Sequence, residues 1–234
     1  MRRDGRKDDE MRPVSFVRNF NEKVAGSVLT SFGLTKVLCT ALVEEGVPPW
    51  RINSGKGWVT GEYAMLPAAT ERRKAREARI GKPDSRSLEI SRLIGRALRS
   101  VVDLSALKDR TVWVDCDVLQ ADGGTRTAAI SGGYIALWDA LKAAKLKKWP
   151  IQTSLAAVSV GIVAGRTLLD LDFPEDSAAA VDLNVVMTGE QEYVELQGTA
   201  ERNPFTGAEL EEMLRLANVG IAHISSRQQA ALES

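Results

Sequence analysis

Histidine and cysteine are almost absent from this sequence. Its 234 residues include one histidine, His223, and two cysteines, Cys39 and Cys116. His223 lies near the end of a predicted C-terminal helix, so a Ser-His or Cys-His nucleophilic mechanism lacks a base. Both cysteines sit in apolar, strand-like runs, where cysteine usually acts as a small buried hydrophobe. We therefore expect no disulfide and no cysteine-bound metal, and a large class of hydrolases is excluded.

The sequence also lacks a net charge and any long apolar run. Lys+Arg and Asp+Glu number 31 each, so a polyanionic partner must be met by a local basic patch. Residues 1–10 are charged and contain no signal-peptide core, and no later stretch approaches the roughly 18 apolar residues of a membrane span. We expect a cytoplasmic protein. With 44% hydrophobic residues the chain can bury a core, and we predict a single domain over residues 1–234.

Apolar periodicity predicts strands and helices in a definite order. The predicted strands cover residues 13–20, 26–32, 35–43, 58–65, 111–119, 156–163, 166–172, 181–188 and 193–199. The predicted helices cover residues 86–102, a segment ending near residue 146, and a C-terminal segment from about residue 206. We interpret the first four strands as an antiparallel meander. The order of elements favours an α+β fold with mixed sheets covered by helices over a doubly wound parallel sheet.

The strongest local signal is the segment Asp122-Gly123-Gly124-Thr125-Arg126-Thr127, between a predicted strand and a predicted helix. Its glycines allow the backbone to approach an anion, the helix N-terminus presents unpaired N–H groups, and Arg126 adds a bidentate fork. The segment predicts phosphate binding, with a plain glycine turn before a capped helix as the alternative. It is not a Walker A loop, because no Gly-Lys-Ser/Thr is present.

Arg86 is a second candidate for binding an anion. It lies at or near the N-terminus of the first predicted long helix, where the helix dipole disfavours a cation. The alternative is a surface arginine paired with Asp84 or Glu89. Three more arginines fall on another face of this helix at helical spacing: Arg92, Arg96 and Arg99.

An acidic cluster surrounds two predicted strands near residue 176. Its members are Asp170, Asp172, Glu175, Asp176 and Asp182. Because side chains alternate along a strand, Asp182 and Asn184 share one face, and Asp176 can fold back beside them. Two carboxylates and an amide can bind Mg²⁺ or act as general acid and base at a phosphoryl leaving oxygen. The alternative is a solvated strand face, the interpretation that we favour for Asp115 and Asp117.

A basic run over residues 72–79 contains five cations, enough charge to hold an RNA backbone. Its alternative is a solvated helix or loop in which Glu71 and Glu77 are internal partners. Trp50 and Trp58 are close enough in sequence to suggest base stacking, although such aromatic residues more often belong to a core or an interface.

Together these residues resemble the ribonuclease PH family over nearly the whole chain. The matching segments are Asp4-Gly5-Arg6, Gly26-Ser27-Val28-Leu29, Gly57-Trp58-Val59-Thr60, Arg92-Leu93-Ile94-Gly95-Arg96, Asp170-Leu171-Asp172, Glu175-Asp176-Ser177 and Gln197-Gly198-Thr199-Ala200-Glu201, with residues 35–41, 44–49, 120–127 and 184–189. The resemblance implies two βαβα-like halves with mixed sheets and covering helices, similar to ribosomal protein S5 domain 2. It also implies a hexameric ring built as a trimer of dimers, and Mg²⁺-dependent phosphorolysis of RNA 3′ ends, notably of tRNA precursors, with inorganic phosphate as co-substrate.

The resemblance also assigns roles to individual residues. The phosphate-binding residues are Arg86, Gly124, Thr125 and Arg126, the catalytic and metal-binding residues are Asp176 and Asp182, and the RNA-binding residues are Arg72, Arg73 and Arg76. Ala68 stands where many relatives have arginine, Ser85 and Ser87 flank Arg86 in place of glycine and threonine, and Ala180 replaces a frequent acidic residue.

Two other functions compete with a phosphorolytic enzyme. One is a catalytically silent RNA-binding ring subunit, which the presence of the matching arginines and aspartates argues against. The other is a small-molecule kinase of the same general fold, which the absence of a longer Gly-Ser-rich ATP loop argues against. RNA incubated with and without phosphate, with nucleoside diphosphates as the readout, separates all three.

Overall fold

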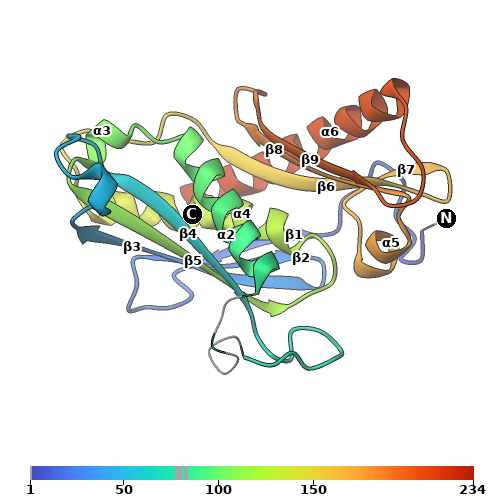
Figure 1. Ribbon diagram of the computed structural model, residues 1–234, viewed down its shortest axis with the longest axis horizontal. Coiled ribbons are helices and arrows are strands. Elements are labelled where there is room, and N and C mark those ends of the chain that lie inside the picture. Colours follow the sequence, from blue (N-terminus) through green and yellow to red (C-terminus); the bar gives the residue numbers. More distant parts are fainter. Residues whose placement is uncertain (1, 77–80, 82–83) are drawn as a thin grey trace.

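The computed structural model describes residues 2–76, 81 and 84–234, which form two β-sheets with helices between and around them (Figure 1). The first sheet has five strands in the order β1-β2-β3-β5-β4. These strands are β1 (Val14–Arg18), β2 (Gly26–Phe32), β3 (Thr35–Glu45), β4 (Trp58–Met65) and β5 (Arg110–Gln120). The α+β class predicted from the order of elements is confirmed.

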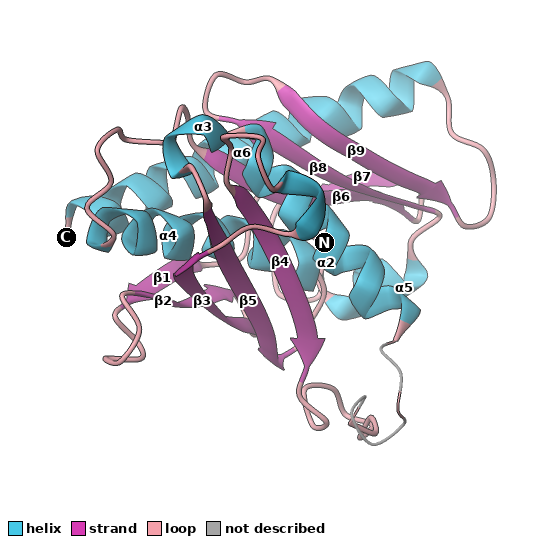
Figure 2. Ribbon diagram, turned by 60° about the vertical axis from the view of Figure 1, so that its left-hand side comes forward, coloured by secondary structure: helices cyan, strands magenta, loops and turns pink. Residues whose placement is uncertain are grey.

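The predicted antiparallel meander is correct for β1, β2 and β3 and wrong for β4. β4 pairs with β5 in parallel, in register from Trp58↔Thr111 to Met65↔Val118, and β5 lies between β4 and β3. The helix α2 (Ser85–Ser100) connects β4 to β5. A helix that connects two strands in this way brings the chain back to the end of the sheet at which the first strand began. The second strand, β5, therefore runs in the same direction as β4. Figure 2 shows α2 lying along β4 at the edge of this sheet.

The second sheet has the order β7-β6-β8-β9, and its neighbouring strands are antiparallel. Its strands are β6 (Leu155–Val163), β7 (Arg166–Leu169), β8 (Val181–Thr188) and β9 (Tyr193–Ala200). The strand predicted over residues 166–172 ends at Leu169, because Asp170 adopts a left-handed φ of 54°. A short helix, α5 (Phe173–Ala178), follows and was not predicted, since its six residues give no helical periodicity.

The helix α4 (Thr125–Ala143) lies between the two sheets, in contact with strands of both. Residues 127–137 of this helix are all buried, including Gly132, whose added Cβ would lie 1.9 Å from the Thr30 Oγ1. The longest helix, α6 (Gly207–Glu233), covers β6 and β7, and it is capped by Thr206, close to the predicted start. One cluster of buried apolar side chains extends through both sheets. The single domain over residues 1–234 stays a prediction.

The connections contain two short helical turns, η1 (Pro49–Arg51) before β4 and α3 (Leu104–Leu107) before β5. Cys39 and Cys116 are buried beneath α4, as expected for cysteines acting as hydrophobes. In the described part of the chain, no helix has both the length and the apolar character needed to span a membrane.

Candidate functional site

A cavity of about 680 Å³ opens between the starts of α2 and α4, the helix α5, and the strands β8 and β9. Its lining includes all the residues proposed for phosphate binding and catalysis: Arg86, Gly124, Thr125, Arg126, Asp176 and Asp182. These residues come from both halves of the sequence and from four different elements or their caps. The cavity therefore places two arginines and a helix N-terminus opposite two carboxylates.

The glycine turn before α4 is held in a shape that side-chain-bearing residues adopt poorly. Gly123 and Gly124 have φ values of 75° and 65°, in the left-handed region that glycine occupies freely. A Cβ added to Gly123 would lie 2.5 Å from the carbonyl oxygen of Leu171. The Thr35 hydroxyl donates to the Gly123 carbonyl at 2.6 Å and accepts from the Asp122 N–H at 2.9 Å. The backbone of Gly123 therefore packs directly against the segment that leads into α5.

The N-terminus of α4 is open toward the cavity. No side chain caps this helix, whose N-cap is Gly124. Its first residue, Thr125, lines the cavity, and the Thr125 hydroxyl shares a hydrogen bond of 2.8 Å with the Tyr63 hydroxyl. Uncapped N–H groups and the positive end of the helix dipole favour an anion at this position. The geometry agrees with the predicted phosphate site, and the role of each residue in it stays a prediction.

Arg126 is fixed in the cavity wall by two polar side chains. Its Nη1 donates to the Gln197 Oε1 at 2.5 Å and lies 3.5 Å from the Glu89 Oε1. Gln197 Nε2 in turn donates to Glu89 Oε1 at 2.8 Å. These contacts use only Nη1 of the guanidinium. Arg126 is therefore a fixed cation whose other N–H groups are available beside the start of α4.

Arg86 lies at the start of α2 with an exposed side chain. Asp84 is the N-cap, and its carboxylate accepts from the backbone N–H of Arg86 at 3.4 Å. Within residues 2–76, 81 and 84–234, Arg86 forms no ion pair. The alternative, in which Arg86 pairs with Asp84 or Glu89, is therefore not observed, and Glu89 lies next to Arg126 instead. The guanidinium is a second cation that can bind an anion in the cavity.

Asp182 and Asn184 lie on the same face of β8, as the strand pattern predicts. Asn184 Nδ2 donates to Asp182 Oδ2 at 3.1 Å, and both side chains line the cavity. Burial raises the pKa of Asp182 to about 6, the charge of Asp176 adds to the rise, and Arg126 is the largest of the opposing influences. Burial also raises the pKa of Asp176, which Arg86 and Arg126 oppose. The two carboxylates therefore repel each other in a partly desolvated space.

The other members of the predicted acidic cluster have structural partners. The buried Asp170 accepts from Arg12 Nε at 3.0 Å and from Arg12 Nη2 at 2.7 Å, and Arg12 Nη1 also donates to the Asp122 carbonyl. Glu175 accepts from Arg2 Nε at 2.7 Å and from Arg2 Nη2 at 2.6 Å. These buried, bidentate ion pairs tie the N-terminal segment to α5 and to the glycine turn. These ion pairs therefore fix the position of α5 relative to the glycine turn before α4.

The side chains at the acidic end of the cavity fit Mg²⁺. Among the described residues, no group of three or more His, Cys, Asp or Glu side chains could hold a metal. Mg²⁺ commonly binds through one or two carboxylates, with water and substrate phosphates completing its coordination. Asp176 and Asp182 supply that arrangement, since burial raises the pKa of Asp182 and the charge of Asp176 raises it further. A divalent cation placed between them would offset their mutual repulsion.

The predicted RNA-binding arginines do not reach the cavity. Arg72, Arg73 and Arg76 are exposed in the segment after β4, and none of them lines it. Arg79 and Glu77, which belong to the same predicted basic run, lie outside the described residues.

Three residues that shape the site were missed as functional candidates. Gln197 and Glu89 orient Arg126, and Arg12 links Asp170 to the glycine turn. Gln197 and its neighbours did match the family segments, which was the available signal. For Glu89 the sequence suggests only a partner for Arg86. Nothing in the local sequence around Arg12 indicates that its partner is 158 residues away.

Asp182 is expected to make the stability of the metal-free protein depend on pH. Its pKa of about 6 lies above that of an unfolded aspartate, so its protonated form stabilises the fold at low pH, and this stability is lost as pH rises through 6. In a chelator, Asp182→Asn should gain melting temperature relative to the native protein between pH 4 and 7. Added Mg²⁺ should close the gap at pH 8. A difference between the two proteins that stays constant over this pH range would contradict the assignment.

Two models of the 3′ exoribonuclease family match the chain, domain 1 over residues 10–142 and domain 2 over residues 153–220. Rrp46 from rice (Oryza sativa) has a similar fold, with a TM-score of 0.83 at 18% identity over 100% of both chains. A chain of the Archaeoglobus fulgidus exosome with RNA bound to the active site gives 0.81 at 23% identity, covering 97% of this chain and 92% of that one. A chain of an archaeal exosome core gives 0.75 at 24%, covering 97% and 89%. These structures establish the likeness of fold, and because the two family models account for most of its length, the chain belongs to the ribonuclease PH family of 3′ exoribonucleases.

Proposed function

We propose that this protein is a phosphate-dependent 3′→5′ exoribonuclease that releases nucleoside 5′-diphosphates by phosphorolysis. The observation that carries the proposal is the shared cavity, in which Arg86, Arg126 and the open end of α4 face Asp176 and Asp182. An anion site next to a pair of carboxylates suits a reaction in which one phosphate attacks another. Membership of the 3′ exoribonuclease family supports RNA as the second substrate.

The arginine side of the cavity binds and orients the nucleophile. One oxygen of inorganic phosphate attacks the phosphorus of the last phosphodiester, and the bond from that phosphorus to the 3′ oxygen of the preceding nucleotide breaks. Arg86, Arg126 and the first N–H groups of α4 hold the attacking phosphate in line with the leaving oxygen. Because an ester bond is exchanged for an anhydride bond, the reaction is reversible, and excess nucleoside diphosphate extends the RNA.

The acidic side of the cavity acts on the leaving group. The 3′ oxygen must take up a proton as it leaves, and a carboxyl whose pKa is raised by burial is suited to supply one. We assign Asp182 to Mg²⁺ binding and Asp176 to metal binding or proton transfer. When bound, Mg²⁺ supplies charge stabilisation at the scissile phosphate and the leaving oxygen.

The RNA substrate that we propose is one with a single-stranded 3′ end, such as a tRNA precursor in the cytoplasm. The exposed Arg72, Arg73 and Arg76 lie beyond β4, where they can contact the RNA backbone outside the cavity. The A. fulgidus exosome, whose fold is similar, has RNA bound to its active site.

We further propose that the protein assembles into a ring of six chains. The outer face of the five-stranded sheet carries exposed apolar side chains, with Val17 52%, Leu42 46% and Trp113 38% accessible. Leu42 and Trp113 are direct partners across β3 and β5, so they form one patch. Contiguous apolar surface of this kind is typical of a protein interface.

Phosphate dependence tests the proposed reaction. RNA with a single-stranded 3′ tail should be shortened only when inorganic phosphate is supplied, and the products should be nucleoside diphosphates. Digestion in phosphate-free buffer that yields monophosphates would show hydrolysis and contradict the proposal. RNA binding without any diphosphate release would identify a silent ring subunit. Phosphate transfer from ATP to a small molecule would identify a kinase.

A further inference from the structure

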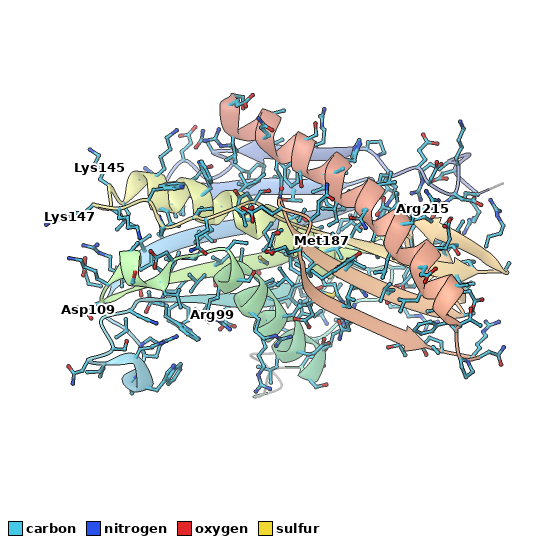
Figure 3. The ribbon with its side chains drawn as sticks, turned by 90° about the horizontal axis from the view of Figure 1, so that it is seen from above. Arg99, Asp109, Lys145, Lys147, Met187 and Arg215 are labelled. Carbon is cyan, nitrogen blue, oxygen red and sulfur yellow. The ribbon has the colours of Figure 1, made fainter. Side chains whose placement is uncertain are left out.

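A groove of about 490 Å³ runs along α2 on the side toward η1 and β4, apart from the catalytic cavity. Its lining includes the three arginines at helical spacing, Arg92, Arg96 and Arg99, together with Trp50 and Trp58. None of these side chains has a part in the reaction proposed above. Arg99 is labelled in Figure 3, beside α2.

The two tryptophans in this groove differ in how much of each ring is available. Trp58 lies under two guanidinium groups, with the Cζ atoms of Arg51 and Arg99 at 4.7 Å and 4.2 Å from its ring centroid. Trp50 meets Trp58 edge to face, with centroids 6.2 Å apart, and is 71% exposed. A ring this exposed, and anchored by its edge, leaves an open face for a planar group to stack on.

The cations around the tryptophans are incompletely neutralised. Arg96 pairs with Glu195 at 2.7 Å, but in the described part of the chain no ion pair involves Arg51, Arg92 or Arg99. Burial lowers the pKa of Arg99, and the charges of Arg96 and Arg51 lower it further. The Arg51 Nε is buried with no hydrogen-bond partner among these residues. Clustered cations with unused donors favour an anionic ligand.

α2 joins this groove to the catalytic cavity. Arg86 at the helix start lines the cavity, and Arg99 near the helix end lines the groove. At the rise of an α-helix, the two positions are about 20 Å apart. A nucleic acid strand whose 3′ end lies in the cavity therefore passes the groove if it follows the helix.

We propose that this groove is a contact site for the upstream part of single-stranded RNA, in which a base stacks on Trp50 and the α2 arginines bind phosphates. Proteins that bind single strands without sequence preference combine an aromatic platform with a cationic track in this way. The inference rests on the proposed function, since it places a distant part of the same substrate. It goes beyond that function in making affinity depend on the length of the single-stranded tail.

The groove favours RNA over a second copy of the chain because cations dominate its charge, with Arg92, Arg96 and Arg99 in the lining against a single carboxylate. Glu62 is the one acidic side chain in its described lining. The exposed apolar patch proposed for ring contacts, Leu42 and Trp113, adjoins the groove where Thr60 pairs with Trp113, but neither of its two side chains lines the groove.

The test compares Trp50→Ala and Arg92→Ala with the native protein on RNAs with 3′ tails of about four and about twelve nucleotides. We measure RNA binding without phosphate and diphosphate release with saturating phosphate. Native affinity should rise with tail length, and each variant should bind the long tail roughly tenfold more weakly while treating the short tail as the native protein does. Trp50→Phe should recover most of the loss.

Arg215→Ala is the matched control, because this exposed arginine lies on α6, far from Arg99 in Figure 3. It should leave the length dependence unchanged. Equal length dependence in Trp50→Ala and the native protein would overturn the inference and leave the proposed function intact. A protein that releases no diphosphate but loses long-tail binding in Trp50→Ala would overturn the proposed function alone. Variants that change the oligomeric state and keep native long-tail binding would show that the groove is a contact between chains.

Discussion

Asp182→Asn should lower nucleoside diphosphate release about a hundredfold or more and leave the fold and the assembly unchanged. The substitution keeps the volume of the side chain and an oxygen that can accept the hydrogen bond from Asn184. It removes the charge that faces Arg126 and the proposed cation site. Because the adjacent Val181 and Leu183 point to the opposite side of the strand and Asp182 itself lines the cavity, the carboxylate does not support the core.

Asp115→Asn is the matched control for this loss. Asp115 also lies on an alternating strand, and burial raises its pKa too, but it does not line the cavity proposed to be catalytic. Diphosphate release, sedimentation and thermal unfolding should be measured for both variants across a Mg²⁺ series. Near-native turnover in Asp182→Asn, or an equal loss in Asp115→Asn, would show that the catalytic carboxylate lies elsewhere.

The parts of the site that depend on local geometry could be predicted from the sequence. Asp182 and Asn184 share a face because strand side chains alternate, and this holds whichever strand lies beside β8. The glycine turn was recognisable because two adjacent glycines before a helix permit the positive φ values found at Gly123 and Gly124. In both cases the physical rule acts within a few residues.

The parts that depend on pairing between distant segments could not be predicted. β4 resembles the strands before it in composition, and only the path of α2 decides that it pairs with β5 in parallel. The ion pair between Arg12 and Asp170 joins residues 158 positions apart, and each looks like a surface charge in its own segment. The sequence places Asp170 in the same acidic cluster as Asp176 and Asp182, whereas in the structure it is buried and, through Arg12, holds the glycine turn in place.

Arg126→Ala should raise the phosphate concentration needed for half-maximal turnover by roughly ten- to a hundredfold. The guanidinium provides charge-assisted hydrogen bonds at the start of α4, and each such contact contributes about 1.5 to 3 kcal/mol. Arg86→Ala should act in the same direction, and RNA binding should change little in either variant. Arg126→Lys should fall between the native protein and Arg126→Ala, because lysine keeps the charge but lacks the fork.

The removal of Arg126 has a second consequence, because Glu89 loses its cationic neighbour. In the native protein the Glu89 Oε1 lies 3.5 Å from Arg126 Nη1, within the cavity lining. In Arg126→Ala this carboxylate would repel the incoming phosphate, so adding Glu89→Gln should recover part of the lost affinity. Glu89→Gln alone should have a smaller effect, since Arg126 already offsets the charge, and the difference defines the coupling between the two residues. Phosphate titrations of the four proteins measure it. Native half-saturation in both Arg126→Ala and Arg86→Ala would place the phosphate site elsewhere in the molecule.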